Sequence, residues 1–491
     1  MGVIKRQGIK NLFIAYTGVV IGAISAILLQ PVFLSTTELG FTRNLYNFSF
    51  MLSIVLPLGL PNIILRFYPQ YKEDDAIKKY FFGFILLYFS ISAIIISSIF
   101  FLFKDSISSL YKKDSELFIN YFLCVIPYAL IITLNSIITA FSQAAYKSTV
   151  PSFLNDIVSR LLVILVTVMY HYRWISFDMY VLFYLLIYCL VIAILIIYLK
   201  KFDLISFRIN LPVLNKIHYK KIIPYGLILL GISFASFCLR NLDSIFLGTY
   251  SLSNVAIYST AVYLAMFIEV PLSSLERISY SKIAENFANK NFVEMNKIYF
   301  DSVKYLMIFG GYIFLGINAC SKYIYEFLPS EYSESLYLIS ILSFGCLVNV
   351  MTGVNNAILY YTSHFKLGAI LLAFAFIFTL GLDLLFIPLY GMLAAACVTA
   401  AVAVLYNVAK FWLIYKIFKF QPYNINSLKI LLLIAVGFII VVFLPSFTSI
   451  AVLNILINGS IISVFYIFCV YKLNVIPEIF DTIKAKFAKR S

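Results

Sequence analysis

The sequence predicts an all-α membrane protein of about 14 transmembrane helices. Of its 491 residues, 62% are hydrophobic and only 12% are charged, about half the charged share of a typical soluble protein. Apolar runs of roughly 20 residues, the length that spans a hydrocarbon core, follow one another along the chain. In lipid such runs must be helices, because every backbone amide needs a partner within the protein.

The predicted spans follow from these apolar runs. They cover residues 11–34, 45–65, 80–103, 117–141, 150–170, 178–199, 222–247, 252–275, 303–320, 335–360, 367–387, 391–415, 428–445 and 450–471. Pro57, Pro61, Pro224 and Pro271 fall within these spans or near their ends. We expect them to kink or break the helices locally.

Positive charge is distributed unevenly over the predicted loops. With the N-terminus in the cytoplasm, most of the 37 Lys and Arg residues fall in inner segments. The outer loops hold few basic residues, namely Arg43, Lys104, Lys112, Lys113, Arg173 and Lys322. This asymmetry predicts two cytoplasmic termini. Insertion and contact with anionic membrane lipids account for the net charge of +15, so nucleic acid is not expected as a partner.

The inner loops suggest a domain organisation. We expect an N-terminal lobe of six helices over 1–200, a cytoplasmic linker over 201–221 and a C-terminal lobe of six helices over 222–416. Two further helices lie in 428–471, followed by a basic cytoplasmic tail over 472–491. The two halves resemble each other weakly, which favours parallel repeats about an axis normal to the membrane.

Several kinds of chemistry are not supported by the sequence. The seven cysteines lie in apolar stretches without a CxxC pair, and the three histidines lie far apart, so no metal site is expected. The longest outer loops, near 104–116 and 321–334, are too short to carry a catalytic domain. We therefore expect a transporter with no catalytic residues and no cofactor, rather than an enzyme.

Short motifs in a fixed order carry a family resemblance. They are Leu39-Gly40, Leu58-Gly59-Leu60-Pro61 with Arg66, Asn241-Leu242-Asp243, residues 255–259, Phe327-Leu328-Pro329 with Tyr332, then Asn355, residues 387–391 and Ala394-Ala395-Ala396. In these features the chain resembles the polysaccharide-transporter flippases of the multidrug/oligosaccharidyl-lipid/polysaccharide (MOP) superfamily, which export O-antigen, teichoic and capsular precursors.

The resemblance covers the whole chain and implies two helical lobes around a central cavity that opens alternately to either face. It implies a lipid pyrophosphate-linked glycan as cargo, a bacterial inner-membrane location, and glycan-assembly enzymes as possible partners beside membrane lipids. One departure concerns span one, where some relatives place arginines. Here its interior offers only Ser25 and Gln30 as polar groups.

Charged residues inside the predicted spans are candidate binding residues, because a charge in the membrane interior is costly. Asp156 and Arg160 are four residues apart on one helix face, with Arg160 near mid-depth. They form either a self-neutralised structural pair or a cavity site in which Arg160 attracts the pyrophosphate, whose oxygens suit a guanidinium.

A second group of polar residues lies at one predicted depth, in the outer third of the membrane. These side chains could hold Na⁺ or transfer H⁺. They are Asp243 on span seven, Thr379 and Asp383 on span eleven, and Thr399 on span twelve. Superfamily relatives are often coupled to cations through carboxylates. The alternative is a structural Arg240–Asp243 pair with a separate acid near the outer interface.

The remaining candidates lie nearer the inner interface. Arg66, Arg277 and Lys410 are close enough to it to snorkel towards water, although the resemblance makes Arg66 and Arg277 plausible as a cationic mouth that collects cargo. Glu269 shares a helix face with Glu276 and is a further cavity candidate. The 37 Tyr and 47 Phe could stack on sugars, while interfacial belts and lipid contacts account for most of them.

Other functions remain open. A multidrug or metabolite antiporter coupled to a cation would use the same fold, with an apolar cavity and one critical acid. A membrane glycan polymerase or ligase is a different class, and the short outer loops argue against it. A major-facilitator transporter would carry a G-x-x-x-D-R motif between spans two and three, where this chain has residues 71–75 without it.

Overall fold

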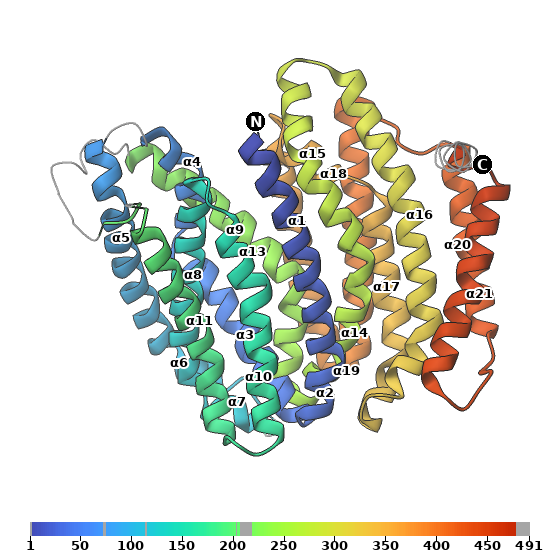
Figure 1. The fold of residues 1–491 in the computed structure, drawn as a ribbon, viewed down its shortest axis with the longest axis horizontal. Coiled ribbons are helices and arrows are strands. Elements are labelled where there is room, and N and C mark those ends of the chain that lie inside the picture. Colours follow the sequence, from blue (N-terminus) through green and yellow to red (C-terminus); the bar gives the residue numbers. More distant parts are fainter. Residues whose placement is uncertain (1, 72–74, 113–114, 203, 207–218, 478–491) are drawn as a thin grey trace. The chain divides into compact units, whose positions relative to one another are not determined.

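The computed structural model describes the whole chain except residues 1, 72–74, 113–114, 203, 207–218 and 478–491. The regular elements of the described residues are all helices (Figure 1), so the predicted all-α class is confirmed. Most of the predicted linker and most of the predicted basic tail lie outside the described residues.

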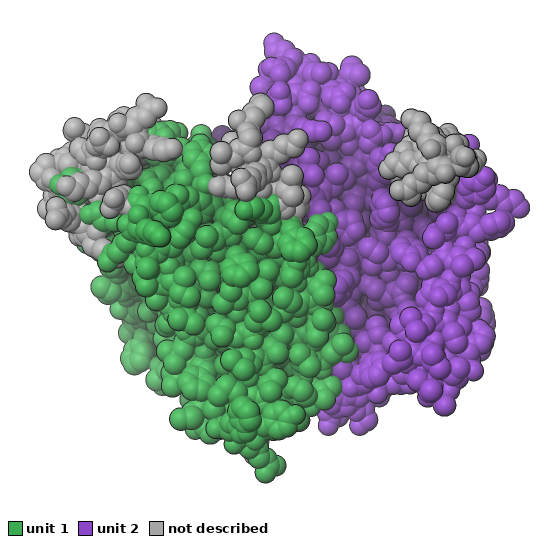
Figure 2. Space-filling view, viewed as in Figure 1, with its two compact units in different colours: residues 1–257 green, residues 258–491 purple. Residues whose placement is uncertain are grey.

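The chain divides into two compact units, Met1–Ile257 and Tyr258–Ser491 (Figure 2). Helix α13, which the sequence analysis places in the C-terminal lobe, packs against α3 and α4 and therefore falls in the first unit. Packing thus divides the chain after Ile257, whereas the sequence repeats place a linker at 201–221. The two lobes defined by the repeats stay a prediction.

The first unit contains the helices of the N-terminal half. In order they are α1 (Gly2–Ala23), η1 (Ile24–Leu29), α2 (Gln30–Phe33), α3 (Thr36–Val55), α4 (Leu60–Tyr71), α5 (Asp75–Leu102), α6 (Lys104–Ser108), α7 (Glu116–Asn120), η3 (Phe122–Cys124), α8 (Val125–Ala144), α9 (Thr149–Phe153), η4 (Leu154–Val158), α10 (Ser159–His171), α11 (Phe177–Lys200) and α13 (Tyr219–Tyr250). Helix α14 (Leu252–Met266) starts in this unit and continues into the second.

Two of these elements, η1 and η4, are π-helical turns inside otherwise α-helical spans. Such turns are rare and often mark functional positions, because they shift the register of the side chains that follow. The turn η4 packs against α1, and α3 packs against α8 and α13. Large aromatic side chains fill the space between α4, α5 and α8, where Tyr68, Phe81, Phe82 and Phe141 are each at most 1% exposed.

Helices α3 and α4 form a bent pair. The two axes differ by 45°, and the break follows Pro57, with positive φ angles of 45° at Leu58 and 85° at Gly59. A Cβ on Gly59 would overlap the Gly226 carbonyl of α13. The break therefore combines the proline kink expected from the sequence with a close approach that only glycine allows.

The second unit contains the remaining helices. They are η5 (Phe267–Glu269), α15 (Val270–Ala288), α16 (Phe292–Tyr325), η6 (Ser330–Ser335), α17 (Leu336–Met351), α18 (Asn355–Tyr360), α19 (Phe365–Phe418), α20 (Ile425–Phe443) and α21 (Ala451–Lys472). Helix α16 is central to the packing, since it contacts α15, α17, α20 and α21. The final two helices therefore join the core of this unit through α16.

Helix α19 is 54 residues long and contains one non-helical residue, Gly391, with φ 55° and ψ −131°. At a rise of about 1.5 Å per residue this length exceeds twice the thickness of a hydrocarbon core. The predicted spans 367–387 and 391–415 lie on the two sides of Gly391. Among the described residues, 12 helices are long and apolar enough to span a membrane, or 13 with the bent pair counted, so the number fourteen stays a prediction.

The contact between α3 and the start of α14 gives a test of the first unit. A Cβ at Gly40 would overlap the Leu252 carbonyl oxygen, whereas a Cβ at Gly231 of α13 would meet nothing within 4 Å. We expect Gly40→Ala to destabilise the protein by about 1–3 kcal/mol, the usual cost of overpacking. The apparent melting temperature of the purified protein should fall for this variant and stay within error for Gly231→Ala; equal melting temperatures would contradict the packing.

Candidate functional site

Arg160 is the central residue of the apolar stretch Thr149–His171 and lies two residues after the end of the π-helical turn η4. Its side chain is half-buried, and its Nη1 donates a hydrogen bond to the Gly18 carbonyl oxygen of α1. A Cβ on Gly22 would overlap the guanidinium, and a Cβ on Gly18 would lie 2.9 Å from that of Asp156. Asp156 and Arg160 therefore both face α1 at two glycines, which is consistent with one shared helix face.

Arg43 is a buried cation that the sequence analysis placed wrongly in an outer loop. It lies within α3, is 6% exposed, and donates hydrogen bonds to the carbonyl oxygens of Ala26 (2.6 Å) and Ala256 (2.8 Å). Ser35 and Glu38 form a capping box that starts α3 at Thr36, earlier than the apolar run suggests. The capping-box spacing Ser-x-x-Glu was the signal that could have placed Arg43 in a helix.

Asp243 lies at the interface of α13 with α3 and is 4% exposed. Its Oδ1 accepts a hydrogen bond from the Ser244 amide (2.7 Å), and Asn47 Nδ2 of α3 donates to Ser244 Oγ (3.4 Å). Arg240, one turn earlier, is exposed. The two members of the Arg240–Asp243 alternative therefore have different environments, with the acid inside the unit.

Arg66 lies on α4 and is exposed. Its guanidinium carbon is 4.3 Å from the centroid of the Tyr225 ring of α13, which is a cation–π distance. Arg277 on α15 of the second unit is exposed as well. Both arginines therefore present their charge at the surface of their own unit, and snorkelling towards water stays a prediction.

The second unit contains a repeated carboxylate–amide contact. Glu269 Oε1 accepts from Asn349 Nδ2 (2.7 Å), and Glu276 Oε1 accepts from Asn356 Nδ2 (2.9 Å). Glu269 and Glu276 are seven residues apart, and so are Asn349 and Asn356. Two turns of one segment therefore face two turns of the other. The equal spacing was visible in the sequence, but only the tertiary structure brings the two segments together.

Lys410 completes this polar network and corrects the expectation that it snorkels to water. It is 1% exposed, its Nζ donates to Asn356 Oδ1 (3.1 Å), and Nζ lies 4.4 Å from the centroid of the Tyr406 ring. Asn356 thus bridges the Lys410 ammonium and the Glu276 carboxylate. Lys410 does not reach water because α18 packs against α19 and encloses the lysine side chain before the end of the helix.

The remaining predicted cation ligands of the second unit lie on the two parts of α19. Thr379 and Asp383 are 2% and 1% exposed and share one helix face, and Thr379 Oγ1 donates to the Ala375 carbonyl (2.9 Å). Thr399 Oγ1 lies 3.5 Å from the Tyr258 hydroxyl. Asp243 belongs to the first unit and Asp383 to the second, so a cation shared by the two stays a prediction. No group of three His, Cys, Asp or Glu side chains suited to a metal occurs in the part of the chain that the structure describes.

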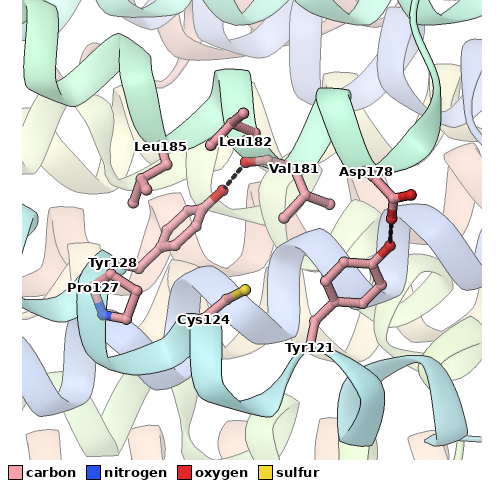
Figure 3. Close-up of a pocket in the computed structure, with 8 residues that line it drawn as sticks. All are labelled: Tyr121, Cys124, Pro127, Tyr128, Asp178, Val181, Leu182 and Leu185. Carbon is pink, nitrogen blue, oxygen red and sulfur yellow. Dashed lines mark hydrogen bonds between the residues drawn. The ribbon is translucent and has the colours of Figure 1, made fainter.

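One pocket of about 120 Å³ lies between α8 and α11, near the start of α11 (Figure 3). Its polar groups are already bonded, since Tyr121 donates to Asp178 and Tyr128 donates to the Val181 carbonyl (2.5 Å). Leu182 and Leu185 complete an apolar lining.

The fold is similar to that of solved transporters. The lipid II flippase MurJ in an inward closed conformation matches with a TM-score of 0.71 and 16% identity, covering 95% of this chain and 99% of that one. The Vibrio cholerae MATE transporter VcmN in its bent form matches with a TM-score of 0.56 and 14% identity, covering 85% and 98%. An inward-facing MATE family transporter of the MOP superfamily matches with a TM-score of 0.56 and 16% identity, covering 84% of this chain and 98% of that one.

The long apolar helices make the chain a multi-pass membrane protein, and these similarities show that it has the fold of MOP superfamily transporters. A family model described as "Polysaccharide biosynthesis protein" matches residues 8–275, just over half of the chain. The chain belongs to this polysaccharide biosynthesis family. No curated protein matches it.

The Asn356 bridge gives a test of the network in the second unit. Asn356→Leu removes a hydrogen bond from both Glu276 and Lys410, and a hydrogen bond to a charged group contributes about 1.5–3 kcal/mol. We expect the apparent melting temperature to fall by several degrees. Asn286→Leu is the matched control, because Asn286 donates to the Lys282 carbonyl of its own helix. The network would be refuted if both variants melted like the parent.

Proposed function

We propose that this chain is a flippase that moves a lipid-linked glycan precursor, of the undecaprenyl-pyrophosphate type, across the bacterial cytoplasmic membrane by alternating access. The single observation that carries the proposal is Arg160, a half-buried guanidinium at the middle of a membrane span. A pyrophosphate cannot enter hydrocarbon without a compensating cation or a hydrated path. A guanidinium has five N–H donors, and its bond to Gly18 uses one of them.

The exposed arginines fit a collecting role in this proposal. Arg66 on α4 and Arg277 on α15 would meet the pyrophosphate at the cytoplasmic side before it reaches Arg160. Glu269 would face the glycan, where its carboxylate and the Asn349 amide offer hydrogen bonds to hydroxyl groups. Membership of the polysaccharide biosynthesis family supports a glycan as the cargo.

Cation coupling would supply the energy for directional transport. Asp243, Thr379, Asp383 and Thr399 are the proposed coupling residues, with Na⁺ or H⁺ as the ion. The near-complete burial of Asp243, Thr379 and Asp383 supports this role, since an oxygen ligand that is kept from bulk water holds a cation more strongly.

The alternative is a cation-coupled multidrug or metabolite antiporter, and the similarity to MATE transporters keeps it in view. An organic cation would avoid Arg160, so a cargo site that depends on this arginine favours the flippase. A glycan polymerase or ligase is less supported, because the match is to the fold of transporters. Both termini are proposed to be cytoplasmic, and glycan-assembly enzymes would deliver the cargo at that face.

The cargo proposal predicts the effect of changing Arg160. Loss of the protein should leave lipid-linked glycan on the inner leaflet and deplete the surface polymer. We expect Arg160→Gln to reproduce most of this defect at a normal protein level, because the pyrophosphate loses its cation, and Arg160→Lys to keep part of the activity. Arg173→Gln, at an exposed arginine between α10 and α11, is the control. Normal export by Arg160→Gln would assign Arg160 a structural role.

The coupling proposal predicts the effect of changing Asp383. We expect Asp383→Asn to abolish the dependence of transport on Na⁺ or on the pH gradient, while the protein still inserts and folds, because the amide cannot carry the negative charge that holds the ion. Transport into proteoliposomes at varied Na⁺ and pH measures this dependence. An unchanged ion dependence in both Asp243→Asn and Asp383→Asn would exclude these acids from coupling.

A further inference from the structure

Tyrosines recur at every fourth position along the first half of α11. Tyr180, Tyr184 and Tyr188 lie on one helix face, and their ring centroids are 6.4 Å and 6.3 Å apart. Tyr128 of α8 adds a ring that is stacked on Tyr184 at 6.2 Å. At about 1.5 Å per residue this tyrosine ladder extends roughly 12 Å, from near the start of α11 to its middle.

The ladder faces the interior of the first unit rather than lipid. Leu182, Leu186 and Leu190 of the same helix are 50%, 44% and 48% exposed, and they are offset from the tyrosines by two residues, or about 200°. Interfacial tyrosines lie near the membrane surfaces, whereas Tyr188 lies at the midpoint of the helix. The ladder is therefore not part of an aromatic belt.

The Tyr188 end of the ladder lies within electrostatic range of Arg160, the proposed pyrophosphate residue. The Tyr188 hydroxyl shares a hydrogen bond with Tyr46 of α3, and the charge of Arg160 acts on the same hydroxyl. Arg160 and Tyr188 each lie at the middle of their spans. Tyr46, Tyr184 and Tyr188 all keep part of their surface exposed, so they can contact a ligand inside the unit.

Neutral amides lie in the same unit, on α8 and η4. Asn135 Nδ2 of α8 donates to Asn155 Oδ1 of η4 (2.8 Å), and Asn155 Nδ2 donates to Thr139 Oγ1 (3.2 Å). All three side chains are half-buried. Amide and hydroxyl groups both donate and accept hydrogen bonds, as a sugar hydroxyl does, so this lining is suited to uncharged polar groups.

We propose that Tyr184 and Tyr188 of the ladder bind the pyranose rings of the cargo glycan while Arg160 holds the adjoining pyrophosphate. Tyr180 and Tyr128 are buried and pack behind them. This inference rests on the proposed function. It adds that the first unit recognises the sugar rings of the cargo. Aromatic rings pack against the C–H face of a pyranose, and phenolic hydroxyls bond to its hydroxyl groups. Since all pyranoses have such faces, Tyr184 and Tyr188 would bind sugar rings without distinguishing one sugar from another.

The test uses the full chain in lipid nanodiscs and two probes, farnesyl pyrophosphate and farnesyl pyrophosphate bearing N-acetylglucosamine, whose Kd values are measured by calorimetry. We expect the sugar-bearing probe to bind the parent protein more tightly. Tyr184→Leu should raise the Kd of the sugar-bearing probe by about three- to tenfold, which corresponds to the loss of one aromatic contact. The Kd of farnesyl pyrophosphate should stay unchanged. Tyr184→Phe keeps the ring and should retain most of the affinity.

Tyr172→Leu is the matched control, because this tyrosine is 62% exposed beyond the end of α10. The ladder is refuted if the two probes bind the parent equally, or if Tyr184→Leu weakens both probes to the same extent as Tyr172→Leu. The variant Arg160→Gln distinguishes a failure of the ladder proposal from a failure of the proposed flippase function. If farnesyl pyrophosphate still depends on Arg160, only the ladder fails; if neither probe binds the parent protein, both proposals fail.

Discussion

A charge inside a membrane span must be held by the protein itself, and the packing of α1 against η4 and α10 meets this constraint. Gly18 and Gly22 leave no Cβ in the contact, so the backbone of α1 approaches Asp156 and the Arg160 guanidinium closely. Arg160 can then bond the Gly18 carbonyl oxygen. A larger residue at either glycine would separate the helices and expose the cation to hydrocarbon, which is costly.

The second unit meets the same constraint with side chains instead of backbone. Asn356 bonds both Glu276 and Lys410, and Thr352 and Asn355 share Asn407 as an acceptor. Amides suit this purpose because one side chain supplies both donors and an acceptor. The two units therefore stabilise buried charge differently, one through close helix approach and the other through a bridging amide network.

Helix α11 shows how one helix can serve two environments. The face with Leu182, Leu186 and Leu190 is exposed towards lipid, and the face with the tyrosines points into the first unit. Both faces are apolar on average, so hydropathy does not distinguish them. The difference lies in the phenolic hydroxyls, which can bond to a polar ligand and have no comparable partner in hydrocarbon.

The sequence by itself determined the helical membrane class, the order of the spans, the break at Pro57 and the Asp156–Arg160 face, because apolar length, proline and helical spacing are local properties. It also predicted the family that the comparisons show. It did not place Arg43 inside α3 or Lys410 in a closed network, and the four-residue spacing of the α11 tyrosines did not by itself show which surroundings they face. Those positions depend on which helices meet, and only the tertiary structure decides which carbonyl, amide or ring a side chain reaches.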